Sequence, residues 1–246
     1  MKEDIIFIVL FSPLLLQGRL IWGVFMKKDK LTKISITSVF CALAFIMTVI
    51  LRFNVAFLSF DFKDAILSII ALMYGPIYGV VSAAIVAILE FLSISDTGLY
   101  GLLMNFVSSA TFVLIAGTIY KYKRSYTGAI ASVGFSVIGV TIVMMFANIL
   151  ITPYYMGVTV KDVINYIPTL LLPFNLCKAL INAAATVVIY KPIRGVLKRA
   201  GIVPNDTNHQ PNKIKTIITF VVATIIIIVT IIILIKFLNG NIEIGR

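Results

Sequence analysis

Residues 128–151 read GAIASVGFSVIGVTIVMMFANILI and contain no Asp, Glu, Lys or Arg. A helix rises about 1.5 Å per residue and a bilayer core is about 30 Å thick, so about 20 apolar residues can cross it. Lys121, Lys123 and Arg124 precede this run, and Pro153 follows it. The pattern predicts a membrane-spanning helix over 128–151 that ends before the proline.

The rest of the 246-residue chain has the same character. Hydrophobic residues make up 60% and charged residues only 13%, with a mean hydropathy of +1.06. A soluble domain carries about 25% charged residues because its surface is wet. Lipid must therefore surround this chain, and only helices or a closed barrel satisfy the backbone there. Runs of about 20 residues favour helices over strands of about ten, so the expected class is an all-α integral membrane protein.

Similar apolar runs predict six core helices and one additional C-terminal transmembrane helix. Gly75-Pro76 separates the second and third helices, because Gly favours a helix end and Pro a first turn. After 128–151 a loop of about ten residues leads to the last core helix. The expected core helices cover 33–51, 62–74, 77–92, 99–120, 128–151 and the stretch from the Pro168 and Pro173 region to about residue 190, and an isoleucine-rich run predicts the additional helix over 214–235.

The expected organisation has four parts. Residues 1–26 form an N-terminal extension, or translation begins at Met26, whose lysine-rich surroundings resemble a cytoplasmic N-terminus; an interfacial or re-entrant segment is the alternative. Residues 27–201 form the six-helix membrane domain. A polar linker over 202–212 then precedes the extra helix within 213–246.

Cations are concentrated in three short segments next to apolar runs. The chain has 21 Lys and Arg against 10 Asp and Glu, a net charge of +11. In a soluble protein this excess would indicate nucleic-acid binding. Here it lies at 27–33, 121–124 and 191–199, where it orients helices by the positive-inside rule. We expect the core N-terminus and the 202–212 linker to be cytoplasmic, and no nucleic-acid partner.

The chain lacks the residue patterns of common catalytic and metal sites. Cys41 and Cys177 lie inside apolar runs, and the single histidine, His209, lies in the polar linker. These residues cannot form a zinc site, and the chain has no GxxxxGK[ST] loop. We therefore expect no metal, no catalytic residue and no ATPase activity.

Four polar side chains inside the expected helices are the main candidates for a binding site. Polar residues in a membrane are costly and tend to mark functional sites. Asn105, Asn148, Asn175 and Lys178 come from three helices and fall at one depth in the outer third of the membrane. A single Asn can instead make only an interhelical hydrogen bond, and Lys178 can snorkel to the surface. Their shared depth favours a common site.

Other polar residues are weaker candidates. Lys178 needs a partner inside the membrane, and Asp61 and Asp64 at the start of the second helix could supply a carboxylate. Tyr155 lies at the outer boundary, where it either belongs to an aromatic belt or covers the site. Glu90, near the outer end of the third helix, is either a site residue or merely one at the membrane interface.

Small residues recur four positions apart on two of the expected helices. They are Ser38 and Ala42 on the first helix, and Ala83 and Ala87 on the third. Small faces let helix backbones approach closely. They predict either packing within the chain or a docking face for another membrane protein.

The segment 172–178, LPFNLCK, resembles the PFNxxK stretch of bacterial riboflavin transporters. These are substrate-binding S components of energy-coupling factor (ECF) transporters. The resemblance covers roughly 31–201 and includes Phe60 to Asp64, Gly75-Pro76 with Gly79, Thr97-Gly98 with Gly101 and Asn105, and Asn148 with Pro153 and Tyr155. The N-terminal stretch and the run after Ile214 depart from that family.

The resemblance implies a six-helix substrate-binding subunit in a bacterial cell membrane. Such a subunit captures riboflavin from outside and joins a transmembrane coupling protein and two cytoplasmic ATPases. It gives Asn105, Asn148, Asn175 and Lys178 roles as vitamin contacts, and it implies docking through the first helix. Riboflavin is then the transported ligand, and no cofactor is expected.

Three other functions remain open at this point. One fold can host many ligands, so the chain could be an S component for another vitamin or precursor. A self-sufficient secondary transporter would favour inverted repeats and buried titratable groups, of which the sequence shows little. An intramembrane enzyme would need a general base or metal set that the spans do not offer.

The charge pattern makes a direct prediction about topology. The 121–126 loop should be cytoplasmic and the 93–98 loop external, because cations are concentrated only in the first. A membrane-impermeant maleimide on intact cells should label Ser95→Cys, and should label Arg124→Cys only after permeabilisation. Labelling at position 124 from outside would overturn this orientation.

Overall fold

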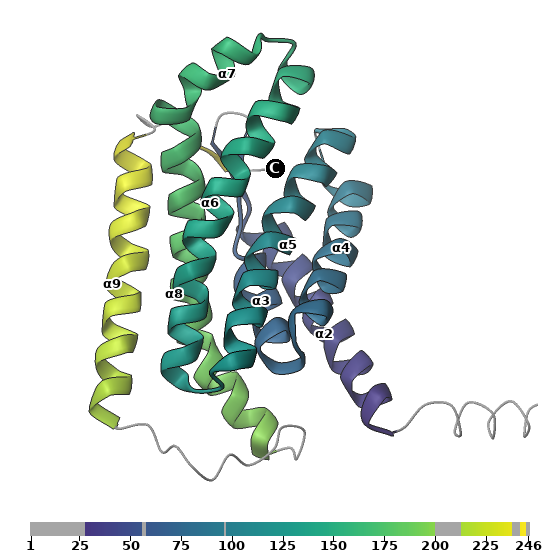
Figure 1. Ribbon diagram of the computed structural model, residues 1–246, viewed down its shortest axis with the longest axis vertical. Coiled ribbons are helices and arrows are strands. Elements are labelled where there is room, and N and C mark those ends of the chain that lie inside the picture. The colour runs from purple at the N-terminus through teal and green to yellow at the C-terminus, as the bar shows by residue number, and fades with distance from the viewer. Residues whose placement is uncertain (1–27, 56–57, 96, 200–212, 238–241, 245–246) are drawn as a thin grey trace, which may run out of the picture. The chain divides into compact units, whose positions relative to one another are not determined.

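The computed structural model of the protein describes residues 28–55, 58–95, 97–199, 213–237 and 242–244 (Figure 1). The chain divides into two compact units, Met1–Thr37 and Ser38–Arg246. In the first unit the described residues are the opening turns of helix α2 (Lys28–Leu51). The expected extension 1–26 and linker 202–212 lie outside the described residues.

Most of the described chain is helical. The remaining helices are α3 (Lys63–Tyr74), α4 (Pro76–Ser93), α5 (Gly98–Tyr122), α6 (Tyr126–Met156), α7 (Val160–Tyr166), the π-helix η1 (Ile167–Leu171), α8 (Leu172–Arg199) and α9 (Lys213–Phe237). Within the described residues, five helical stretches are long and apolar enough to cross a membrane: Lys30–Leu51, Pro76–Ser93, Gly98–Tyr122, Tyr126–Met156 and Val160–Arg199. The helical membrane class is confirmed.

One of the expected helices, α3, has 12 residues and is too short to be a full-length span by this measure. Helix α9 has 25 residues, of which Ile218–Thr230 form an apolar stretch. The expected count of six core spans plus one is therefore not confirmed helix by helix.

A small antiparallel sheet follows α2, although the sequence analysis predicted no strands. Strands β1 (Phe53–Val55) and β2 (Leu58–Phe60) form a hairpin in which Phe53 pairs with Phe60. Strand β3 (Ile242–Ile244) pairs with the other edge of β1, giving the order β2-β1-β3. Strands of three residues are too short to show a clear period-two pattern in the sequence.

The region after residue 151 differs from the prediction in two ways. Pro153 lies inside α6 and does not end it. Proline removes only one backbone donor, and the helix ends instead at Gly157, whose φ of 65° is the left-handed conformation of a C-cap. The expected ten-residue loop is largely the helix α7. Thr159 and Asp162 start that helix with a reciprocal capping box.

Helix α5 packs against α3, α4 and α6, and α8 packs against α3, α6 and α9 (Figure 1). Gly117 makes one of these contacts possible. A Cβ at this position would lie 2.8 Å from the Cα of Pro76, closer than real Cβ atoms come. Glycine therefore lets α5 approach the first turn of α4.

The two small-residue pairs have different environments. Ala83 and Ala87 on α4 are 1% and 2% exposed, so they pack inside the chain. The docking prediction is wrong for this pair, because the chain's own side chains cover it. Ser38 and Ala42 on α2 are exposed, so docking through them stays a prediction.

We expect a chain shortened to residues 26–201 to fold without α9 and β3. Lipid tails are as apolar as the side chains of α9, so lipid can replace α9 against α8. In detergent the shortened chain should be monodisperse, with an unfolding temperature within about 4 °C of the full chain, equivalent to roughly 1 kcal/mol. Residues 26–237, which keep α9 but lack β3, are the control. Aggregation of 26–201 alone would show that α8 requires α9.

Candidate ligand-binding site

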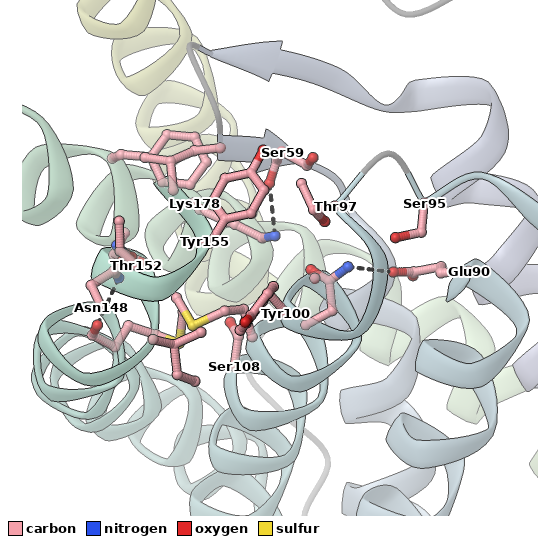
Figure 2. A pocket seen from close by; sticks show the side chains of 18 of the residues that line it. Ser59, Glu90, Ser95, Thr97, Tyr100, Ser108, Asn148, Thr152, Tyr155 and Lys178 are labelled. Atoms are coloured by element: carbon pink, nitrogen blue, oxygen red, sulfur yellow. Dashed lines mark hydrogen bonds between the residues drawn. The ribbon is translucent and has the colours of Figure 1, made fainter. Parts of the chain in front are cut away.

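A cavity lies where α4, α5, α6 and α8 meet the β1–β2 hairpin (Figure 2). Its empty volume is ≈ 770 Å³, which includes space open to solvent. Apolar and aromatic side chains form part of its wall. The polar part of the wall includes Ser59, Glu90, Asn105, Asn148, Asn175 and Lys178.

The structure brings the four main candidates together. Asn105 on α5, Asn148 on α6, and Asn175 and Lys178 on α8 all line this cavity. The expected convergence of three helices is therefore confirmed, whereas the role of these residues as ligand contacts stays a prediction. Tyr155 lines the same cavity.

Lys178 is held inside the protein by two acceptors. Its Nζ lies 2.8 Å from Oδ2 of Asp61 and donates to the backbone oxygen of Ser59 at 2.9 Å. The Lys178 and Asp61 side chains are only 9% and 2% exposed, so snorkelling is wrong and Asp61 is the partner. Burial alone would raise the pKa of the Asp61 carboxyl, which lies between β2 and α3. The ammonium groups of Lys178 and Lys63 overcome this effect and lower that pKa to about 2.

Two of the cavity amides are oriented by backbone carbonyls one helical turn earlier. Asn148 Nδ2 donates to Met144 O at 2.7 Å, and its Oδ1 accepts from Thr152 at 3.0 Å. Asn175 Nδ2 donates to Leu171 O at 2.8 Å. An amide nitrogen carries two hydrogens, so each side chain keeps a second hydrogen for another acceptor.

Glu90 belongs to a buried ion pair and is not exposed at the surface of the described chain. Its Oε2 lies 2.7 Å from Nζ of Lys63, with both side chains less than 5% exposed. The same oxygen accepts from Asn105 Nδ2 at 2.9 Å. Lys63 also lies 3.6 Å from Asp61, which is the partner of Lys178. A continuous set of buried ion pairs therefore links Glu90 on α4 to Lys178 on α8.

The model of the family described as "ECF transporter, substrate-specific component" matches residues 32–190. The chain belongs to this family. The resemblance seen in the sequence is thereby confirmed. The match contains every residue of the cavity wall, from Arg52 to Lys178, whereas α9 and β3 lie outside it.

Individual relatives of this S component include two transporters and a solved structure. This chain is 30% identical over 172 residues to the riboflavin transporter RibU of Staphylococcus aureus (strain TCH60), and the alignment covers 66% of this chain and 90% of RibU. This chain is also 26% identical over 174 residues to the riboflavin transporter FmnP of Bacillus subtilis (strain 168), and the alignment covers 65% of this chain and 91% of FmnP. The solved structure is described as "Structure and mechanism of the S component of a bacterial ECF transporter". It matches with a TM-score of 0.59 and 29% identity, over 68% of this chain and 98% of the other.

Of the aromatic side chains around the S component's cavity, the sequence analysis named only Tyr155. Phe174 on α8 lines it and packs edge-on against Phe60, with ring centroids 6.1 Å apart. Tyr100 and Tyr155 face each other at 6.3 Å, and Figure 2 shows both among the side chains around the cavity. Phe174 is part of the PFNxxK resemblance, so its neighbours Asn175 and Lys178 could have indicated it.

Two polar residues near the site, Asn182 and Asp64, hold helices together and do not line the cavity. Asn182 lies on the face of Asn175 and Lys178, but it does not line the cavity. Its Nδ2 donates to Asp61 O at 2.9 Å and its Oδ1 accepts from Ala65 N at 3.0 Å, which ties α8 to the start of α3. Asp64 likewise lies away from the cavity and accepts from Ser109.

In the described part of the chain, no group of three or more His, Cys, Asp or Glu side chains is placed to hold a metal ion. Cys41 and Cys177 are buried and unpaired with each other. The residues that line the cavity can hold a ligand through hydrogen bonds, charge and apolar contact.

Proposed function

We propose that this S component binds riboflavin in the cavity and that a separate ATP-hydrolysing module drives its import. The observation that carries the proposal is the convergence of Asn105, Asn148, Asn175 and Lys178 on one partly apolar cavity. This cavity lies within residues 32–190, which the family model matches, and two relatives of the chain are the riboflavin transporters RibU and FmnP.

The chemistry of the wall suits a flavin. An isoalloxazine ring is flat and largely apolar, and its polar edge carries carbonyl groups and an N–H. Ligand sites typically combine an apolar lining with a few fixed polar groups. Phe174, Met104 and Met144 supply apolar surface, while Asn148 and Asn175 each offer an N–H. The Lys178 ammonium has a third hydrogen besides those given to Asp61 and Ser59, and a ribityl hydroxyl can accept it.

The same proposal covers orientation and partners. The cation pattern puts the core N-terminus in the cytoplasm, so the cavity opens to the outside. A transmembrane coupling protein and two cytoplasmic ATPases then complete the transporter, as the family implies. The exposed Ser38 and Ala42 face of α2 supports docking of the coupling protein there, because small residues allow close approach.

Purified protein should bind riboflavin and quench its fluorescence, and it should not hydrolyse ATP alone. A chain of residues 26–201 should bind equally well, because all cavity residues lie between Arg52 and Lys178. Fluorescence titration measures the binding, and phosphate release measures hydrolysis. Vesicles that contain only this chain yet accumulate riboflavin against a gradient would indicate a self-sufficient secondary transporter. Binding of another vitamin but not riboflavin would keep the family and change the ligand.

Two substitutions on α8 test the site itself. Asn175→Ala should weaken riboflavin binding by about 1–3 kcal/mol, the usual cost of leaving a buried polar partner unpaired. That is roughly five- to 150-fold in affinity. Lys178→Met should lose a comparable amount, because it keeps the apolar stem and removes only the ammonium.

Matched controls are available on α7, where Asn165 and Lys161 are exposed. Asn165→Ala and Lys161→Met should bind as the unaltered chain does. The unfolding temperature of Lys178→Met must be measured as well, since among the described residues the Asp61 carboxylate then keeps the Lys63 ammonium at 3.6 Å and the Lys63 backbone N–H at 3.3 Å. Unchanged affinity in both folded α8 variants would remove the main support for this site.

A further inference from the structure

Asn105 and Glu90 meet at the wall of the cavity, and this contact has a fixed direction. Asn105 Nδ2 donates to Glu90 Oε2 at 2.9 Å, one of the dashed contacts in Figure 2. The carboxylate is paired with the Lys63 ammonium at 2.7 Å. An ionised carboxylate only accepts hydrogen bonds. Turning the Asn105 amide by half a turn would therefore bring its Oδ1 into repulsive contact with the Glu90 oxygen.

The orientation decides what Asn105 offers to a ligand. Asn105 is half-buried and lines the cavity. Its Nδ2 faces Glu90, so its Oδ1 is on the branch directed away from the carboxylate. Within the described residues this Oδ1 accepts no hydrogen bond. The α5 side of the cavity therefore presents an acceptor.

Glu90 is itself held from three sides. Thr48 Oγ1 lies 3.4 Å from its Oε1, while Lys63 and Asn105 bond its Oε2. The residue is 3% exposed. A buried ion pair adds little to stability, because desolvation offsets its attraction. Stability alone is thus a weak explanation for a carboxylate in the cavity wall.

We propose that Glu90 is a positioning residue: it fixes the Asn105 amide so that the α5 wall accepts a hydrogen bond from an N–H or O–H of the ligand. This inference rests on the proposed binding function. The α8 side of the cavity carries Lys178, which can only donate. The site therefore selects a ligand with a donor toward α5 and an acceptor toward α8, a pairing that riboflavin can supply through its ring N–H or hydroxyls and its ring carbonyls.

Two replacements at position 90 test this role. In Glu90→Gln the amide oxygen can take the place of Oε2 and accept from both Lys63 and Asn105, so riboflavin affinity should stay within about threefold of the unaltered chain. Glu90→Leu removes the acceptor, which leaves Asn105 free to turn its amide, and affinity should fall about fivefold or more. In Asn105→Asp two carboxylates face each other, and affinity should fall at least as much.

Asn148→Ala, alone and combined with Glu90→Leu, is the matched control. Asn148 belongs to α6 and bonds Met144 and Thr152, so the losses from Asn148→Ala and Glu90→Leu should add, whereas Glu90→Leu should cost little once Asn105 is replaced by Ala. Fluorescence titration gives the affinities, and unfolding temperatures show that each variant folds.

The outcomes are distinct. Loss of affinity in Glu90→Leu, its retention in Glu90→Gln, and no further loss from Glu90→Leu when Asn105 is replaced by Ala support the proposal. Undiminished affinity in Glu90→Leu, or an equal loss from it in the Asn105→Ala background, overturns the role of Glu90. Where Glu90→Leu does not fold, undiminished affinity in Asn105→Asp overturns it. Absence of riboflavin binding in the unaltered chain contradicts the proposed function instead.

Discussion

The ion pair between Lys178 and Asp61 is the interaction on which the cavity depends. It joins α8 to the residue that follows β2, and Lys178 also bonds the Ser59 carbonyl within that strand. Asn182 bonds the backbone oxygen of Asp61 from the next turn of α8. Charges inside a lipid-embedded protein are costly unless they are paired and hydrogen-bonded. The hairpin is thereby held against α8 and forms one wall of the cavity.

Internal partners also orient the polar side chains before a ligand arrives. Backbone carbonyls one turn earlier hold Asn148 and Asn175, and Glu90 holds Asn105. Fixing these groups in advance reduces the entropy lost on binding. Each still has an atom to offer: a second hydrogen on Asn148 and Asn175, and an oxygen on Asn105. The network therefore restricts both the position and the polarity of a ligand.

The sequence predicted much of the site because polar residues in a membrane protein are rare and costly. Asn148 and Lys178 stand out within apolar runs, and helical spacing gives their depth. Pairing between distant residues has no such signal. Glu90 and Lys63 are 27 positions apart, and only tertiary packing brings them to 2.7 Å. The continuation of α6 through Pro153 is also decided by context, since the Gly157 cap overrides the local preference.

The segment beyond the family match adds to this S component at two places. Helix α9 packs against α8, the helix that carries Asn175 and Lys178. Strand β3 then pairs with β1, so that β1 has a hydrogen-bonded neighbour on both sides. An unpaired strand edge invites pairing with other chains, and a strand from the same chain prevents this at β1. Strand β2 pairs with the other side of β1 and contains Ser59, whose carbonyl accepts from Lys178. The C-terminal segment therefore supports the same hairpin that Lys178 holds from α8.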